Sequence, residues 1–334
     1  MSSLPTRKLG SQGCEAAAVG FGCMSLTPGF YGAGGLSDEA AIPILRRALE
    51  LGVTLFNTSD LYGPFINEML LSNVLPGTGA VIATKYGPMF KEGKIIMDGS
   101  RENVRRCCLG SLERLKVPTL DIFTFRGPPD PKFPIEETMA EVKELIQEGK
   151  VRYVGLSEVN SEDIRRAHAV VPITAIELEW SLFTRDAERD IVPTCRELGI
   201  GIMAYSPLGR GLLAGRFAKP DDFEENDWRR TSPRFVGDNF ENNLKLVQRV
   251  KALAEKKRCT PGQLALAWLL HQGDDIIPIP GTKNIKYLEE NVGALNVNLT
   301  KEELKELEDA VPEHAVAGER YPNMHGTYNQ SSRH

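Results

Sequence analysis

Short apolar segments recur along the chain and alternate with longer stretches whose apolar residues are spaced three to four positions apart. Near-continuous apolar runs of this length are typical of parallel strands that are buried on both faces of a sheet. We therefore expect eight strands, at residues 18–21, 53–57, 80–85, 120–125, 151–156, 173–178, 200–204 and 275–279.

The stretches between these segments have the spacing of amphipathic helices. Residues 40–51 and 135–146 place their apolar side chains on one stripe, and Ser100 begins another helix of this kind. Strands that alternate with helices predict an α/β protein, and eight such units predict a closed (β/α)8 barrel, or TIM barrel. An open, doubly wound sheet is the alternative. The length of 334 residues fits a single barrel domain over residues 1–334.

Three segments fall outside this repeat. Residues 7–9 and 15–17 flank a turn that contains glycine, and they predict a hairpin that caps the floor of the barrel. Residues 219–239 are too many for a simple connection, and loops of this length are usually functional lids or disordered. After Pro312 the chain is polar and irregular, and we expect this C-terminal tail to lie over the mouth of the barrel.

Composition and charge argue against several classes of function. The formal net charge is −5 at pH 7, so we expect no binding to nucleic acid or to an anionic membrane. No apolar run reaches the ~20 residues that cross a bilayer, and the first residues lack the apolar core of a signal peptide. The six cysteines form no CxxC pair and have no histidine at zinc-ligand spacing, so no metal site is expected. These features favour a cytoplasmic protein.

Titratable side chains are concentrated where the expected strands end, which is the rim that carries the active site in barrels of this type. Tyr62 follows the second strand, and Lys85 ends the third. A phenol is a poor acid at neutral pH, but a nearby ammonium lowers its pKa. Tyr62 would then suit the role of proton donor to a developing alkoxide. The alternative is that Tyr62 is an ordinary loop aromatic and Lys85 a solvated charge.

Gly281, Thr282 and Lys283 follow the last expected strand and open a helical stretch. Backbone amides and the helix dipole at such a position favour an anion, so these residues predict a phosphate site. An ordinary turn and helix cap would have the same pattern. Residues 209–215 are also rich in glycine, but their spacing does not match a dinucleotide fingerprint, and the acidic residue that this motif requires is missing.

Taken together, these strand ends resemble those of the aldo-keto reductases, from about Arg7 to Tyr321. The stretches that carry the resemblance are residues 20–24, 57–63, 83–85, 135–139, 149–157, 204–209 and 279–291. Several long matches in the same order are more specific than any single motif.

The resemblance implies reduction of a small carbonyl compound to an alcohol with NADPH. It implies that Tyr62 is the general acid, that Lys85 is its partner, that Tyr205 stacks on the nicotinamide and that Ser157 binds its carboxamide. Lys283 would favour NADPH through its extra phosphate. The other positions that the resemblance assigns to the cofactor are Gly22, Met24, Glu177, Ser206, Leu208, Gly209, Gly281, Thr282, Glu290 and Asn291.

The chain departs from the usual family pattern at several of these positions. Asn57 stands where the family has its catalytic aspartate, and Arg126 stands at about the position of its catalytic histidine. Glu158 and Glu177 occupy the positions of the asparagine and glutamine that bind the carboxamide. These departures are similar to those of the pyridoxal reductase branch. They imply pyridoxal or a similar aromatic aldehyde as the substrate.

Asn57 can still hydrogen-bond Lys85, but it removes a negative charge. Without that charge Lys85 would act more strongly on Tyr62, and would itself be easier to deprotonate. Asp60 lies three residues farther along and could restore a carboxylate nearby, although solvation at the rim is the other interpretation of this residue.

Two classes of function remain open at this point. The first is an active carbonyl reductase. The second is a regulatory subunit that binds the cofactor on the same kind of barrel, with little turnover. Retention of Tyr62 and Lys85 favours the enzyme, since the fold alone does not fix the function.

Overall fold

The computed structural model describes residues 4–28, 34–91, 94–322, 324 and 327–328. Its central feature is a parallel sheet of eight strands in the order β12-β11-β10-β9-β8-β5-β4-β3. The bounds of these strands are β3 (Phe21–Gly22), β4 (Leu55–Asn57), β5 (Val81–Tyr86), β8 (Leu120–Arg126), β9 (Val151–Ser157), β10 (Ala175–Glu179), β11 (Gly201–Tyr205) and β12 (Ile276–Pro278).

Two hydrogen bonds join the ends of this sheet to each other. The backbone amide of Gly20 donates to the carbonyl of Pro278 at 2.9 Å, and that of Gly22 donates to the carbonyl of Pro280 at 3.2 Å. The sheet therefore closes beside β3 and β12. The expected (β/α)8 barrel is confirmed, and the open sheet is not what the chain forms.

The first strand is shorter than expected and begins later. Residues 18–21 were the predicted span, but only Phe21 of this span belongs to β3. The amide of Ala18 donates to the carbonyl of Pro5 at 2.8 Å, so this apolar stretch first completes the N-terminal hairpin and then enters the barrel. Its hydrophobicity reflects burial in both places.

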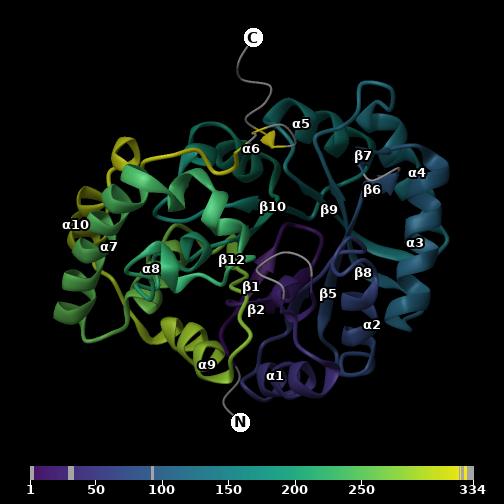
Figure 1. Ribbon diagram of the computed structural model, residues 1–334. Helices are drawn as coiled ribbons and strands as arrows, with labels where there is room; N and C mark the ends of the chain where they lie inside the picture. Colours follow the sequence, from purple (N-terminus) through teal and green to yellow (C-terminus); the bar gives the residue numbers. More distant parts are fainter. Residues whose placement is uncertain (1–3, 29–33, 92–93, 323, 325–326, 329–334) are drawn as a thin grey trace.

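Helices surround the strands as a ring (Figure 1). Their bounds are α1 (Asp38–Glu50), α2 (Ile66–Ser72), α3 (Arg101–Leu115), α4 (Ile135–Gln147), α5 (Ser161–Val170), α6 (Ile191–Leu198), α7 (Gly237–Lys257), α8 (Pro261–Leu270), α9 (Ile285–Gly293) and α10 (Lys301–Ala310). Ser100 caps α3 as expected, because its side chain accepts a hydrogen bond from the amide of Asn103. Val104, Cys108 and Leu115 on the inner stripe of α3 are buried.

The interior of the barrel has its own apolar core, separate from the layer between strands and helices. Its strand residues include Leu55, Ala83, Ala175 and Met203. Successive side chains of a strand point to opposite faces, so the residues two positions farther along each strand also face the barrel axis, nearer its mouth. In β4, β5, β10 and β11 those residues are Asn57, Lys85, Glu177 and Tyr205.

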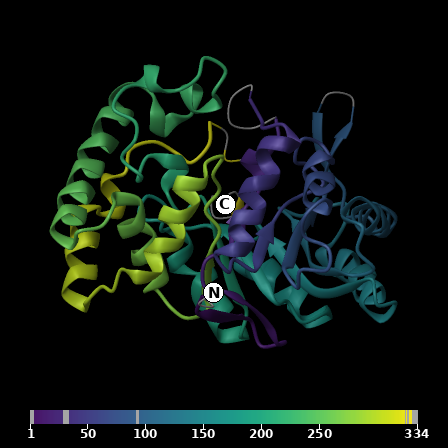
Figure 2. The same ribbon diagram turned by 90° about the horizontal axis from the view of Figure 1, so that it is seen from below.

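The hairpin of β1 (Thr6–Leu9) and β2 (Cys14–Ala17) closes the floor of the barrel, as expected. Figure 2 shows it, in purple, at the end opposite the second hairpin, which consists of β6 (Pro88–Lys91) and β7 (Lys94–Met97). Leu9 of the hairpin joins the inner core, and Arg7 donates to the carbonyl of Ile276 at 2.6 Å. The floor is thus tied to the strands that it covers, and the site lies at the other end.

The long segment at 219–239 is ordered by short 3-10 helices at Pro220–Asp222, Trp228–Thr231 and Pro233–Phe235, and α7 begins at Gly237. Phe223 is buried and contacts the rings of Phe235 and Phe240 edge-on. Disorder, one of the two interpretations of this segment, is therefore wrong, and its aromatic residues pack it beside the mouth. No helix in the described part of the chain is long and apolar enough to cross a membrane.

Candidate active site

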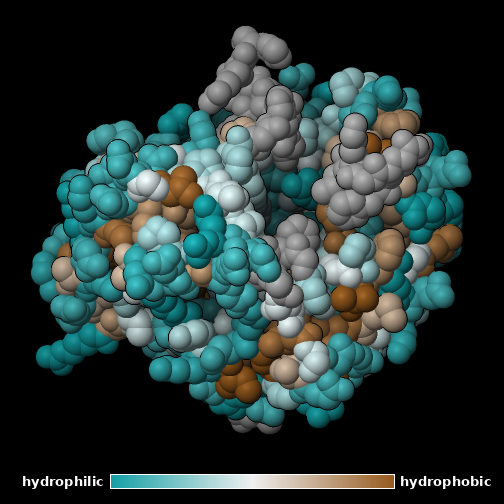
Figure 3. Space-filling view, viewed as in Figure 1, coloured by the Kyte–Doolittle hydropathy of each residue, from teal (hydrophilic) through white to brown (hydrophobic). Residues whose placement is uncertain are grey.

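A cavity of about 850 Å³ opens at the mouth of the barrel, and Figure 3 shows this face hollowed near its centre. Strand ends, the connection after β11 and the turn before α9 all contribute to its wall. Of the residues expected in the site, those that line the cavity are Gly22, Met24, Asn57, Tyr62, Lys85, Arg126, Ser157, Glu177, Tyr205, Ser206, Leu208, Gly281, Thr282, Lys283 and Asn291.

Gly209 and Glu290 lie just outside the described lining of this cavity. Glu290 accepts hydrogen bonds from Thr260 at 2.9 Å and from Arg216 at 3.4 Å. Arg216 does line the cavity, so Glu290 contributes to the site indirectly, by holding the Arg216 guanidinium. Gly209 has a φ of 55°, in the left-handed region that glycine adopts without strain, so it shapes the turn after β11.

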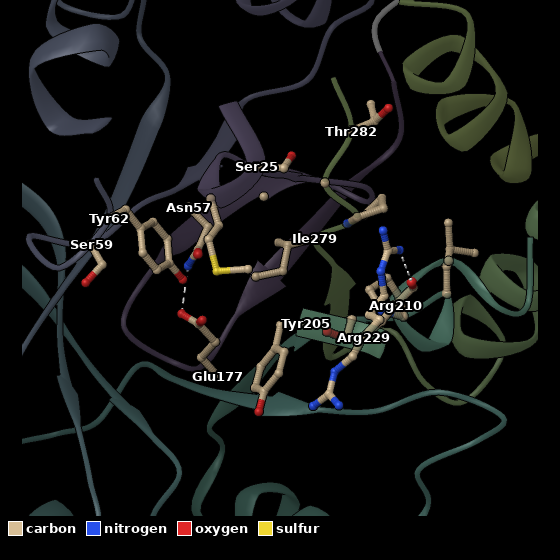
Figure 4. Close-up of a pocket in the computed structure, with 18 of the residues that line it drawn as sticks. Ser25, Asn57, Ser59, Tyr62, Glu177, Tyr205, Arg210, Arg229, Ile279 and Thr282 are labelled. Atoms are coloured by element: carbon tan, nitrogen blue, oxygen red, sulfur yellow. Dashed lines mark hydrogen bonds between the residues drawn. The ribbon is translucent and has the colours of Figure 1, made fainter. Parts of the chain in front are cut away.

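Lys85 is buried at the closed end of the cavity, with 3% of its surface exposed. Its Nζ donates to Asn57 Oδ1 at 2.7 Å and forms an ion pair with Glu177 Oε1 at 2.9 Å. Asn57 Nδ2 donates in turn to Glu177 Oε2 at 2.7 Å, and Figure 4 shows the side chains of Asn57, Glu177 and Tyr62 converging at this end. Lys85 is therefore not a solvated rim charge.

The negative charge that Asn57 removes is present in this site after all. It comes from Glu177 on β10, which was expected only among the cofactor ligands. A carboxylate within 3 Å of an ammonium opposes the loss of its proton. The expectation that Lys85 is easier to deprotonate is therefore wrong. Burial lowers the pKa of Lys85, but the charge of Glu177 and its hydrogen bonds, together with the interaction with Tyr62, outweigh burial, and the pKa is raised overall.

Tyr62 lies next to this group, with Lys85 Nζ 4.9 Å from the centre of its ring. Burial raises the pKa of Tyr62 above its ordinary value, and Glu177 acts in the same direction. Lys85 and Arg126 lower the pKa, but less than burial raises it. The expectation of a lowered pKa is therefore wrong in its net direction. The phenol keeps its proton at neutral pH, beside cations that would stabilise its phenolate.

Arg126 reaches the same cavity from the end of β8. The register of the sheet pairs it with Ser157 of β9, and Ser157 with Glu177 of β10, so these residues form a row at the mouth. In the described part of the structure, the side-chain hydrogen bond of Arg126 is a long one of 3.5 Å to the carbonyl of Gly127. Its guanidinium can therefore donate to a group in the cavity.

Tyr205 is held by a carboxylate on the neighbouring strand end. Its hydroxyl donates to Glu158 Oε1 at 2.6 Å, and Tyr321 from the C-terminal segment lies 3.4 Å from the same hydroxyl. Glu158 has a φ of 53°, and such a left-handed backbone at a non-glycine residue is found mostly where the surroundings enforce it, often at functional sites. Burial and Glu158 raise the pKa of Tyr205 well above its ordinary value, so its ring is fixed in place as a neutral phenol.

The turn before α9 differs in detail from the expected helix start. The helix begins at Ile285, with Asn284 as its cap, rather than at Gly281. Asn284 accepts from the amide of Lys286 at 2.9 Å, and its own amide donates to Thr282 Oγ1 at 3.1 Å. Lys283 lines the cavity, and its Nζ donates to the carbonyl of Gly34 at 3.0 Å, in the segment before α1.

Several lining residues were not found from the sequence. Arg210, Arg216 and Arg229 also line the cavity, and Figure 4 shows Arg210 and Arg229 far from Tyr62. Each of the three is paired with a carboxylate, of Glu179, Glu290 and Asp227 respectively. Arg216 stacks on Tyr287, with 3.1 Å from its guanidinium carbon to the ring centre. Two of these residues lie in segments that already stood out in the sequence. Arg210 lies in the discounted stretch 209–215, and Arg229 lies in the long segment 219–239.

The cavity has the chemistry that a nicotinamide dinucleotide requires. The buried Lys85 group, Arg126, Ser157 and Tyr205 line part of the wall, and Lys283, Arg216 and Arg229 add cations suited to phosphates. Ser25 Oγ lines the cavity and is buried without a hydrogen-bond partner in the described structure, as expected of a group whose partner is a ligand. The residues present therefore fit such a cofactor.

The sequence profile of the Aldo/keto reductase family matches residues 18–312. The chain belongs to this family. A probable aldo-keto reductase 1 of Glycine max is 47% identical over 322 residues, which cover 95% of this chain and 91% of the relative.

Solved structures of aldo-keto reductases have the same fold. A glycerol dehydrogenase of Gluconobacter oxydans superposes with a TM-score of 0.85 at 29% identity, covering 95% of this chain and 98% of the other. A holo-form aldo-keto reductase of Bacillus halodurans gives a TM-score of 0.77 at 26% identity, covering 93% and 97%. The protein is thus an oxidoreductase that reduces small carbonyl compounds with a nicotinamide cofactor.

Two of the five histidines, His168 and His271, take structural positions in this aldo-keto reductase. His168 Nδ1 accepts from the amide of Ile173 at 3.1 Å, and His271 Nε2 accepts from the amide of Leu299 at 3.2 Å. His325 and His334 lie outside the described residues. Over residues 4–28, 34–91, 94–322, 324 and 327–328, no group of three or more metal-binding side chains is close enough to hold an ion.

Proposed function

We propose that this aldo-keto reductase reduces reactive aldehydes with NADPH and that Tyr62 donates the proton. The observation that supports this proposal best is the position of Lys85, buried between Glu177 and the ring of Tyr62. A buried ammonium that is held against a phenol stabilises the phenolate left by proton donation. A regulatory subunit with little turnover would have no need of this arrangement.

Bound NADPH supplies the hydride for the carbonyl carbon. Hydride addition leaves negative charge on the carbonyl oxygen, and a donor within hydrogen-bond reach must neutralise it. Tyr62 holds a proton for this purpose, because burial keeps its pKa high until charge develops next to it. Lys85 then faces the new phenolate, and Arg126 can donate to the oxygen but cannot release a proton.

Lys283, Arg216 and Arg229 are the side chains that would hold the phosphates, with Ser206, Leu208, Gly281, Thr282 and Asn291 along the same wall. Ser157 and Tyr205 would hold the nicotinamide end. We infer a preference for NADPH from Lys283, which lines the cavity, because its ammonium could make a charge-assisted contact with the additional phosphate. We also propose that residues 1–334 form a single barrel domain.

For the substrate we propose an aldehyde with an electron-rich oxygen next to the carbonyl group. Arg126 takes about the position at which the family has a histidine, and a guanidinium can bind two neighbouring oxygens at once. Pyridoxal has such a phenolic oxygen beside its aldehyde and is our best single candidate. An internal hydrogen bond that this phenol donates to the aldehyde oxygen would also polarise the carbonyl, which reduces the need for the histidine.

The proposal is tested by measuring NADPH consumption with a panel of aldehydes at equal concentration. The panel contains pyridoxal, salicylaldehyde, benzaldehyde and 4-hydroxybenzaldehyde, so that the position of the phenol is the variable. We expect turnover with the first two to exceed that with the last two. Equal rates for salicylaldehyde and 4-hydroxybenzaldehyde would contradict the role of Arg126, and no turnover with any aldehyde would favour the regulatory subunit.

A further inference from the structure

We propose that Glu177 is the positioning carboxylate for Lys85 and that it replaces, from the opposite side of the barrel, the acid that Asn57 no longer supplies. This inference rests on the proposed function, because it assigns Glu177 a part in the proton donation by Tyr62. It concerns two departures from the usual family pattern, at strands that do not pair with each other. The structure brings these two residues and Lys85 into one group.

The geometry around Lys85 shows that both departures meet at the same ammonium. Glu177 Oε1 is 2.9 Å from Lys85 Nζ, Glu177 Oε2 is 3.2 Å away, and Asn57 Oδ1 accepts from it at 2.7 Å. Each of the three residues is only 3% exposed. Buried charges must be paired, since desolvation of an isolated ion costs several kcal/mol. The carboxylate that Lys85 requires is therefore supplied by β10.

Asn57 is suited to this partner in a way that an aspartate would not be. Its carboxamide accepts from Lys85 and donates Nδ2 to Glu177 Oε2 at 2.7 Å. An aspartate has no proton to donate when ionised, so it would place a second negative charge against Glu177. The usual family pattern has an aspartate at the first of these two positions and a glutamine at the second. This chain also has one acid and one amide there, but the amide is Asn57 and the acid is Glu177.

The charged and titratable groups around Lys85 come from several elements. Glu177 approaches from β10, Tyr62 from the segment after β4, and the thiol of Cys23 from the segment after β3. Burial raises the pKa of Cys23, so this thiol stays neutral. Arg126, on β8, acts on Tyr62 rather than on Lys85. Glu177 is therefore the carboxylate that keeps Lys85 charged.

Loss of Glu177 should shift the alkaline limit of the reaction. In Glu177→Gln, burial would lower the pKa of Lys85 with only Tyr62 to oppose it, so the hydride step should fail at a lower pH. An opposite charge at this distance typically moves a pKa by about 1–3 units, and we expect the alkaline limb of the single-turnover rate to move down by about that much. In Asn57→Asp/Glu177→Gln, which carries the acid on the other strand, the limb should return toward that of the wild type.

Glu68→Gln is the matched control for a buried ion pair. Glu68 is fully buried and pairs with Arg114 at 2.6 Å, without a contact to Lys85. The Glu68→Gln variant should be less stable than the wild type, but the alkaline limb of its single-turnover rate should stay at the wild-type pH. An unchanged limb in Glu177→Gln together with weaker NADPH binding would overturn the proposal, because Glu177 would then serve the cofactor. An exchanged double variant no better than Glu177→Gln would overturn it as well.

A measurement without substrate separates this inference from the proposed function. Lysine labelled with ¹³C at Cε reports the titration of Lys85, whose signal is assigned by its loss in Lys85→Met. In the wild type its midpoint should lie above the ordinary value of about 10.4, and in Glu177→Gln below the wild-type midpoint. A wild-type midpoint below the ordinary value would refute the pairing even if a variant fails to fold. If this titration behaves as expected but no aldehyde is reduced, the proposed function fails and the pairing stands.

Discussion

Asp60 lies three residues after Asn57, in the segment that carries Tyr62. Only 5% of its surface is exposed, so the idea that it is a solvated rim charge is wrong. Burial, with Glu68 as a second contribution, raises the pKa of Asp60 to about 7, although Arg114 and Ser59 act in the opposite direction. Asp60 therefore cannot restore a permanent charge near Lys85, and Glu177 has that role.

This raised pKa predicts a pH-dependent stability. The folded-state value of about 7 lies above the unfolded value of about 3.9. The contribution of Asp60 is therefore complete below pH ~4 and is lost as the pH rises to ~7. Asp60→Asn should remove this loss of stability with rising pH. The free energy of unfolding of the variant, relative to that of the wild type, should therefore increase by roughly 3–5 kcal/mol from pH 4 to 8. Urea unfolding at four pH values measures it, and parallel curves would contradict it.

At the scale of elements, strand ends were the part of the site that the sequence could predict. Apolar runs mark where strands stop, and parallel strands of a barrel end at one rim, so Tyr62, Lys85 and Tyr205 were expected around one mouth. The contact between Lys85 and Glu177 could not be predicted in this way. These residues are on β5 and β10, which do not pair in the sheet. Only closure of the barrel brings their side chains together across its axis.

Several short elements and one helix start could not be predicted from the sequence, for a different reason. The hairpin β6–β7 and the 3-10 helices between Pro220 and Phe235 are too short for a period to appear in the sequence. The start of α9 was expected at Gly281, but its cap is Asn284, because a side chain that accepts an amide hydrogen bond can end a turn at any of several nearby positions. Arg216 and Arg229 were missed because their roles depend on these connections.

Lys283, in the turn before α9, gives the prediction that belongs to this scale. Lys283→Ala should raise the Kd of NADPH by about tenfold or more, since a hydrogen bond to a charged group contributes about 1.5–3 kcal/mol. The Kd of NADH should change much less. Titration of both cofactors by fluorescence measures the two effects, with Lys286→Ala in the first turn of the same helix as the control. An equal loss for both cofactors would contradict the preference.

At the scale of the whole molecule, the C-terminal segment is fastened to the barrel by buried charges. Arg320 is 2% exposed and lies 3.5 Å from Glu158 Oε1 and 3.7 Å from Glu179 Oε2. Arg210 pairs with the same Glu179 at 2.9 Å and also donates to the carbonyl of Arg320. The segment that follows the last helix is thereby tied to the ends of β9 and β10, and Tyr321 is placed on the wall of the cavity.

Removing the charge of Arg320 should therefore be costly. Arg320→Met keeps most of the volume but leaves buried carboxylates with less compensation, and breaking a buried ion pair typically costs about 3–5 kcal/mol. Arg47→Met removes an exposed guanidinium that pairs with Glu50 and Glu289, and it should cost much less, because exposed ion pairs contribute little to stability. Urea unfolding of both variants at pH 7 gives the comparison. Similar losses in the two would show that Arg320 does not fasten the segment.

The central claim is that Tyr62 donates the proton in spite of Asn57 and the missing histidine. Tyr62→Phe keeps the ring next to Lys85 and deletes only the hydroxyl. Because removal of a general acid typically costs about 10²–10⁴ in rate, the single-turnover rate of aldehyde reduction should fall by that factor while the Kd of NADPH stays nearly unchanged. Asn57→Asp should lose much less. A Tyr62→Phe variant that reduces the aldehyde at the wild-type rate, with the hydride step limiting, would contradict the account.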